Sequence, residues 1–64
     1  MEFSFIVEIP NNLFKYYTTF KGWNWLKENN YSIYNDYDVI STYSSLIFRF
    51  KTKEIAIAFA LANL

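Results

Sequence analysis

The last eleven residues of the chain, EIAIAFALANL, constrain the fold most, because they carry no charge after Glu54. As a strand, this stretch would place its large side chains on one face and its alanines on the other. As a helix, it would be apolar on two opposite sides. Alanine is the best helix former and is depleted in strands, so we predict a helix from Lys53 to about Ala62. Thr52 is the predicted N-cap, and Glu54 in the first turn is favoured by the helix dipole.

The two apolar sides of this predicted helix cannot both be covered by one sheet. We expect Phe59 and Ala56 to pack against the sheet. Three other residues lie on the opposite side of the helix, at about 100° per residue, and we expect them to form part of a partner-binding surface. These residues are Ile57, Leu61 and Leu64.

Alternation with a period of two predicts three strands. The first runs from Phe3 to Ile9 and ends at Pro10, because proline has no N–H for a strand ladder. The second covers Tyr37–Tyr43, and the third covers Leu46–Lys51 after a turn at Ser44 and Ser45. From the phase of each element we expect six side chains to be the most buried, namely Phe5, Val7, Phe20, Phe48, Phe50 and Phe59.

A helix is predicted between the first two strands. Apolar residues recur at steps of three and four from Leu13 to Glu28, and Asn11 or Asn12 would supply the N-cap. Gly22 would weaken the middle of this helix by about 1 kcal/mol relative to Ala, and would give a bulky neighbour room against the sheet. The asparagines that follow Glu28 predict its end, because Asn tolerates a left-handed conformation.

The resulting order of strand, helix, strand, strand, helix predicts an α+β fold in a single small domain over residues 1–64. A right-handed crossover makes the first two strands parallel, with the third strand between them in the order 1-3-2. Both helices would then cover one face. This arrangement looks like a ferredoxin-like unit that lacks its fourth strand, and it leaves the outer edge of the first strand unpaired.

The composition removes several kinds of chemistry. The chain has no Cys and no His, so it lacks disulfides, thiolate ligands and the commonest general base. Asp36 and Asp38 with Glu28 do not have the spacing or the glycine of a calcium loop, and two carboxylates in such a stretch more often form turns. We therefore expect no catalytic, cofactor-binding or metal-binding residues, and no enzyme activity.

The aromatic content, 23% of the chain, has two interpretations. Phe, Tyr, Asn, Ile and Lys have AT-rich codons, so an AT-rich genome explains it without any function. Stacking on bases would instead make the protein a single-stranded nucleic-acid binder. Six basic residues balance six acidic ones, which does not favour nucleic acid. The face away from the helices would show no aromatic residue of the first or third strand, only Ser4, Ile6, Glu8, Ile47, Arg49 and Lys51.

The segment FRFKTKEIAIAFAL resembles small uncharacterised proteins of tailed bacteriophages. These have a strand, a Trp-rich helix, and a Phe-x-Phe strand that leads into a helix with an Ala-x-x-Phe core pair. Here these features fall on Phe48, Phe50, Ala56 and Phe59, and the IVEIP end of the first strand fits as well. The resemblance implies this fold and a phage setting, but no activity. The relatives tend to be charged where this chain has Ile55, Ala60 and Ala62, which argues against a fully solvated last helix.

We therefore predict a non-enzymatic protein-binding module, with a host protein as the partner in a phage setting. Trp23 and Trp25 lie about 200° apart on the first helix, and we expect Trp25 at the surface as an interface anchor. No segment reaches the roughly 18–20 apolar residues of a membrane span. Glu2 stands where a signal peptide has Lys or Arg, so we expect a cytoplasmic protein.

Self-association is the first alternative to a foreign partner. A chain of 64 residues without disulfide or metal has little core to spare. Its last helix and the open edge of its first strand would both be covered in a homodimer. We therefore expect a homodimer, and a purely structural one would need no foreign partner.

Overall fold

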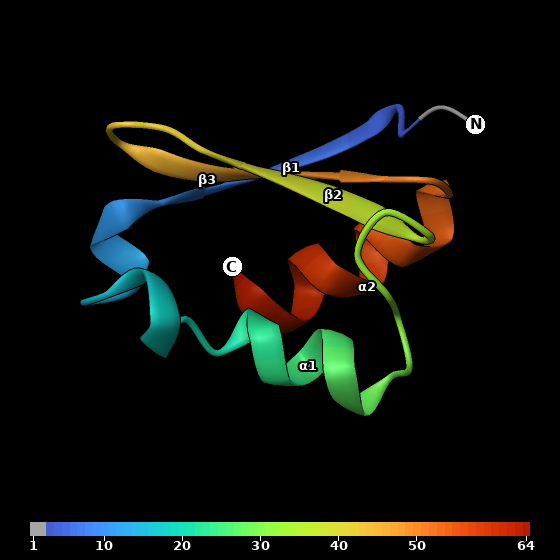
Figure 1. Cartoon of the computed structure of the whole chain (residues 1–64), viewed down its shortest axis with the longest axis horizontal. Helices are drawn as coiled ribbons and strands as arrows, with labels where there is room; N and C mark the ends of the chain where they lie inside the picture. The colour runs from blue at the N-terminus through green and yellow to red at the C-terminus, as the bar shows by residue number, and fades with distance from the viewer. Residues whose placement is uncertain (1–2) are drawn as a thin grey trace.

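The computed structural model describes residues 3–64 of the chain. Within those residues one sheet contains β1 (Phe5–Pro10), β2 (Tyr37–Ser41) and β3 (Ser45–Phe50), in the order β1-β3-β2. The α-helices α1 (Gly22–Glu28) and α2 (Lys53–Asn63) both lie on one side of this sheet (Figure 1). The predicted α+β fold, with its strand order and its two helices on one face, is confirmed.

The central strand, β3, pairs antiparallel with both of its neighbours, so β1 and β2 run parallel to each other. The register places Phe48 between Val7 and Val39. The predicted phase of β3 is also confirmed, because Leu46, Phe48 and Phe50 are all buried beneath the helices. The alternate residues of the sheet face away from the helices.

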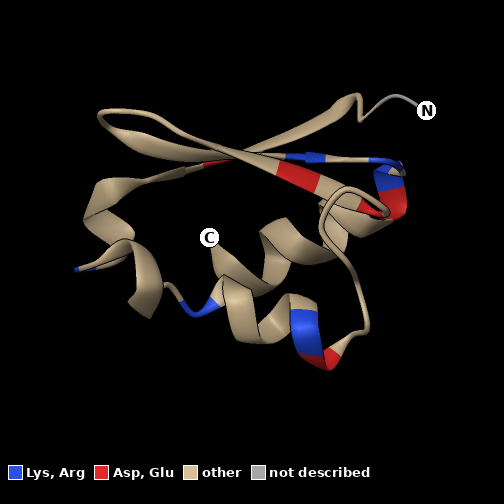
Figure 2. Ribbon diagram, viewed as in Figure 1, with Lys and Arg blue, Asp and Glu red and all other residues tan. Residues whose placement is uncertain are grey.

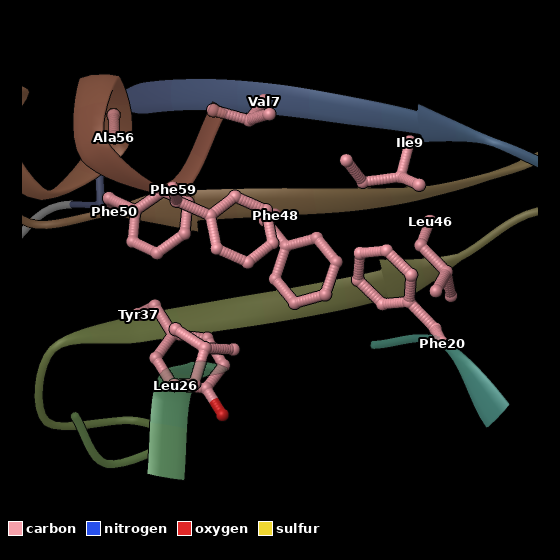
Figure 3. Packing of buried hydrophobic residues seen from close by; sticks show 10 residues of the cluster. All are labelled: Val7, Ile9, Phe20, Leu26, Tyr37, Leu46, Phe48, Phe50, Ala56 and Phe59. Atoms are coloured by element: carbon pink, nitrogen blue, oxygen red, sulfur yellow. The ribbon is translucent and has the colours of Figure 1, made fainter. Parts of the chain in front are cut away.

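An aromatic cluster between the sheet and the helices forms the centre of the core (Figure 3). The rings of Phe48 on β3 and Phe59 on α2 have centroids 4.7 Å apart. Phe50 lies 5.0 Å from Phe59, and Phe20, from the segment before α1, lies 5.8 Å from Phe48. The buried apolar residues of the core are Val7, Ile9, Phe20, Leu26, Tyr37, Leu46, Phe48, Phe50, Ala56 and Phe59.

Phe5 is the one residue of the six expected in the core that is not buried. Its side chain is 39% exposed, although it lies on the same face of β1 as the buried Val7. Phe5 is the first residue of a strand at the edge of the sheet, opposite Phe50, and no described strand lies beyond it. The phase of the strand was predicted correctly, but the position at a sheet corner leaves this ring partly in water.

The segment between β1 and α1 differs most from the prediction. The helix predicted over Leu13–Glu28 is formed only from Gly22 onward, and two 3₁₀ turns, Asn11–Leu13 and Tyr17–Thr19, precede it. The Thr19 hydroxyl donates to the Tyr16 carbonyl at 2.9 Å and accepts from the Tyr16 N–H at 3.1 Å. This local closure replaces a helical turn, because threonine and aromatic residues favour helices weakly and a hydroxyl competes for backbone groups.

The predicted cap of that helix has another role. Asn11 donates its side-chain amide to the Tyr43 carbonyl at 2.9 Å and its backbone N–H to the Ser44 carbonyl at 3.0 Å. These bonds tie the end of β1 to the turn between β2 and β3. In that turn the Thr42 N–H donates to the Ser45 carbonyl at 2.8 Å, which ends β2 two residues before the predicted Tyr43.

The outer edge of β2 is partly covered by the segment that precedes it. Ile33 forms an isolated parallel bridge with Tyr37, and the Tyr34 N–H donates to the Tyr37 carbonyl at 2.6 Å. Tyr34 has a positive φ of 68°, which turns the chain back beside the strand.

The end of α1 agrees with the prediction for the first helix. Asn30, just after α1, has a φ of 63°, the left-handed conformation that asparagine tolerates.

The last helix forms as predicted. The Thr52 hydroxyl accepts from the Ile55 N–H at 3.3 Å, which caps α2, and Glu54 lies in the first turn. Ala56 and Phe59 are buried against the sheet. Asn63 is also buried, and its side-chain amide donates to the Phe59 carbonyl at 2.9 Å, so its polar group is satisfied within the helix.

Gly22 makes room for the ring of Phe20, as predicted, although it begins α1 rather than lying in its middle. A Cβ at Gly22 would come within 2.3 Å of Cε2 of Phe20. The ring cannot simply move aside, because it packs against Phe14, Trp23, Phe48 and Phe59.

We predict that Gly22→Ala destabilises the fold by about 1–3 kcal/mol, although alanine normally stabilises a helix by about 1 kcal/mol relative to glycine. Urea unfolding at low protein concentration measures the change. The same substitution in a Phe20→Leu background removes the clash and should be neutral or stabilising. An equal loss in both backgrounds would show that the Phe20 ring is not the cause.

A second prediction concerns Tyr37, whose pKa is raised above its ordinary value of 10.0 chiefly by burial, with smaller contributions from Tyr17 and Asp36. As the pH rises past about 10, the unfolded chain loses this proton before the folded chain does. Stability should therefore fall as the pH rises past about 10. Urea unfolding should show a smaller fall for Tyr37→Phe. Tyr43, which is fully exposed at 100%, supplies the control Tyr43→Phe, whose pH dependence should match the unmodified chain.

Candidate protein-interaction surface

Two of the three carboxylates considered as a possible catalytic or metal-binding set, Asp36 and Asp38, have structural partners. Asp36 accepts the Ser32 N–H at 2.8 Å in the loop before β2. Asp38 forms a bidentate ion pair with Arg49, while Glu28 ends α1. Over residues 3–64, no group of three or more His, Cys, Asp or Glu residues lies close enough to hold a metal ion. Asp36 and Asp38 therefore stabilise a loop and a strand pair.

The open face of the sheet carries the Asp38–Arg49 ion pair at its middle. The two residues are cross-strand neighbours on β2 and β3, and Nε of Arg49 donates to Oδ1 of Asp38 at 2.7 Å. This hydrogen bond raises the pKa of Arg49. Around the pair lie Ile6, which is 64% exposed, and the partly exposed Ile40 and Ile47. As expected, none of these open-face positions on β1 and β3 is aromatic.

The outer side of α2 is apolar and uncharged. Ile57, Leu61 and Leu64 are 49%, 82% and 63% exposed, as the helical phase predicted. Figure 2 shows charge only in the first turn of α2, where Lys53 and Glu54 lie. No helix in the described part of the chain is long and apolar enough to cross a membrane. The three exposed side chains form one apolar side of the helix.

A shallow groove joins this side of α2 to the outer edge of β1. Its volume is about 360 Å³. The partly exposed Phe5 lies on its strand wall, and Ile57 lies on its helix wall. The complete lining is Ser4, Phe5, Ile6, Val7, Lys53, Ala56, Ile57 and Ala60. We use the name α2–β1 surface for Ile57, Leu61 and Leu64 together with this groove and the outer edge of β1.

The outer edge of β1 presents unpaired backbone groups. The Asn11 N–H points to Ser44 across the sheet, and the direction of backbone groups alternates along an antiparallel pair. The N–H and C=O groups of Phe5, Val7 and Ile9 therefore face β3, and those of Ile6 and Glu8 point outward. The backbone of Pro10 also points outward, so its lack of an N–H removes no hydrogen bond to β3. No strand among residues 3–64 pairs with this edge.

Trp25, the fourth residue expected at the binding surface, lies elsewhere. It is half-buried on α1, with its ring 5.6 Å from Phe59 and 5.8 Å from Tyr31. Trp23 is also half-buried, with Nε1 donating to the Tyr17 carbonyl at 2.7 Å. The expected contrast between an exposed Trp25 and a buried Trp23 is not present. The structure brings together Ile57, Leu61 and Leu64 on α2, but Trp25 contacts the inward side of that helix.

The sequence did not predict two features of the molecular surface, one in the α2–β1 groove and one elsewhere. Phe5 joins the groove only because β1 is an edge strand, which its alternating pattern does not show. A second depression, of about 340 Å³, lies beside Lys15, Tyr16 and Tyr17, in the segment predicted to be helical. Its other lining residues are Asn11, Phe14, Ser41 and Thr42. The Lys15 ammonium lies 5.4 Å from the centre of the Tyr16 ring, so the charge in this depression is next to an aromatic ring of the same chain.

We predict that Leu61→Asp lowers the free energy of unfolding of the monomer by only about 1 kcal/mol, because Leu61 is 82% exposed and the cost comes from the lower helix propensity of Asp and its charge in the last turn of α2. Phe59→Ala on the inward side should cost about 3–5 kcal/mol. Urea unfolding at low protein concentration measures both changes. A large loss of stability in Leu61→Asp would mean that this side chain has a structural role within one chain.

Comparisons with protein-family models, curated proteins and solved structures give no significant match to the chain. The resemblance to small phage proteins therefore stays a prediction from short motifs. Any function has to be inferred from the surface that the fold exposes.

Proposed function

We propose that the protein is a non-enzymatic protein-binding module that acts through the α2–β1 surface. The observation that supports this function is the continuity between an uncharged apolar helix side and an unpaired strand edge, joined by one groove. Such a surface offers two known kinds of protein contact, namely strand addition and the burial of a helix side. In the phage setting suggested by the sequence resemblance, a host protein in the cytoplasm would be the foreign partner.

The apolar side of α2 would contribute binding energy, and the edge of β1 would fix the orientation of the partner. Full burial of a leucine side chain is worth about 1.5–3 kcal/mol, and Leu61 has most of its side chain still to bury. Hydrogen bonds to the outward groups of Ile6 and Glu8 would fix the direction of an added strand. Because α2 carries no charge after its first turn, an apolar partner surface is favoured over a charged one.

Single-stranded nucleic-acid binding has less support. Recognition modules that stack bases on a sheet need aromatic side chains on the open face. The positions there are Ile6, Ile40 and Ile47 around an ion pair. The equal number of basic and acidic residues also gives no excess positive charge for phosphates.

We predict that a tagged chain retains proteins from a bacterial lysate through Leu61. Leu61→Asp should lose them, because a carboxylate buried in an apolar contact costs several kcal/mol. Ala62→Asp is the matched control, since Ala62 is also exposed and lies in the same helical turn but about 100° away. Quantitative mass spectrometry of the retained proteins measures the difference.

Proteins retained by the unmodified chain and by Ala62→Asp, but lost from Leu61→Asp, would support the proposed function. Equal retention by all three chains would show that binding does not use this surface. The proposed function would fail if nothing were retained and the chain also did not associate with itself.

A further inference from the structure

We propose that the α2–β1 surface binds a second copy of this chain, with the two β1 strands paired antiparallel around a two-fold axis at Val7. The proposal rests on the proposed function, because it uses the same surface and names its occupant. The pairing would join two three-stranded sheets into one continuous sheet, with α2 of each copy on the same side of it. A two-fold axis would cover the strand edge and the helix side of both copies at once.

The backbone determines which registers are possible. An outward residue of one β1 must face an outward residue of the other, so only Ile6 and Glu8 can form hydrogen-bonded pairs. If Ile6 faces the partner's Glu8, both outward residues of each strand are used, and Val7 lies on the axis. If Glu8 faced the partner's Glu8, two carboxylates would be opposed, and Ile6 would face the partner's Pro10, which has no N–H.

The remaining register uses less of the strand. If Ile6 faced the partner's Ile6, Glu8 would lie opposite the partner's Ser4, which precedes β1. Only one hydrogen-bonded pair would then fall within the two strands. The register centred on Val7 is therefore the one that pairs every outward N–H group of β1 and places no like charges opposite each other.

The helices would meet at a suitable distance in this arrangement. Because α2 contacts both β1 and β3, we place its axis about half a strand spacing inside β1. Neighbouring strands are about 4.8 Å apart, so the two α2 axes would lie about 10 Å apart across the two-fold axis. Packed helices are separated by about 8–10 Å, so the sides that carry Ile57 and Leu64 would be in contact. Lys53 lies at the start of this side of the helix, and neither helix has a charged residue after Glu54.

The size of the interface suits a weak dimer. The exposed apolar side of α2 supplies on the order of a few hundred Å² per copy. The edge of β1 and the exposed part of Phe5 add to this area. Specific interfaces begin at about 600 Å² per partner, so we expect dissociation in the micromolar range rather than a permanent dimer.

Light scattering from low micromolar to submillimolar concentration should show a mass rising toward twice the 7.7 kDa of one chain. Ile57→Asp should keep the mass near one chain over that range, because Ile57 lines the groove and lies in the proposed helix contact, whereas Ala62→Asp should behave like the unmodified protein. A mass of one chain at every concentration would overturn the proposal. Proteins captured from the lysate through Leu61 would in that case still support the proposed function with a foreign partner.

Cysteine cross-linking tests the register, since the chain contains no Cys. Ile6→Cys and Glu8→Cys alter exposed side chains, and hydrogen-bonded antiparallel residues have Cα atoms about 5.5 Å apart, within disulfide range. Mild oxidation of a mixture of the two variants should give a disulfide that joins one to the other, identified by its mass. Ile40→Cys, on the open face of β2, is the matched control and should not link to Glu8→Cys.

Each alternative result of the cross-linking contradicts the proposed pairing. Efficient linkage of Ile6→Cys to itself, or of Glu8→Cys to itself, would place the axis at another residue. A doubled mass without linkage between the two variants would show that the copies associate through a different surface.

Discussion

The contact between Phe48 and Phe59 is the interaction on which the rest of the structure depends. Their ring centroids are 4.7 Å apart, and the contact joins the central strand to the last helix. Phe20 and Trp25 reach the same pair from the segment before α1 and from α1 itself. Because these rings fill the space between the layers, α2 is held with one side inward and the other side in water. The exposed apolar side of α2 is thus a direct result of how the core is packed.

Local patterns were sufficient to predict the order and phase of the strands and the last helix, although β1 begins at Phe5 and includes Pro10, and β2 ends at Ser41. The phase of β3 and the Thr52 cap of α2 each depend on neighbouring residues alone, and both are confirmed. The segment over residues 13–21 has helical spacing too, but its conformation depends on contacts that spacing does not reveal. Phe20 is inserted beside Phe48, and the Thr19 hydroxyl closes a turn on Tyr16. Tertiary packing overrides a weak local preference here.

The helix side of the candidate surface could be predicted from the sequence, but the groove and the position of Trp25 could not. The exposure of Ile57, Leu61 and Leu64 follows from helical geometry once α2 has one side fixed. The placement of Trp25 was not predictable, since its surroundings are set by Tyr31 and Phe59 rather than by its own helix. The groove could not be foreseen either, because it requires knowing that α2 lies beside the edge strand rather than beneath the middle of the sheet.

The bridge between Ile33 and Tyr37 shortens the edge of β2 that is open to strand addition. A sheet with two open edges can add strands without end, and that is how fibres grow. Here the Tyr37 carbonyl, which points outward from β2, already accepts from Tyr34, so this edge is open only from Val39 to Ser41. The edge of β1 is open along its whole length. The two edges therefore offer different lengths of strand to a partner, and the longer one belongs to β1.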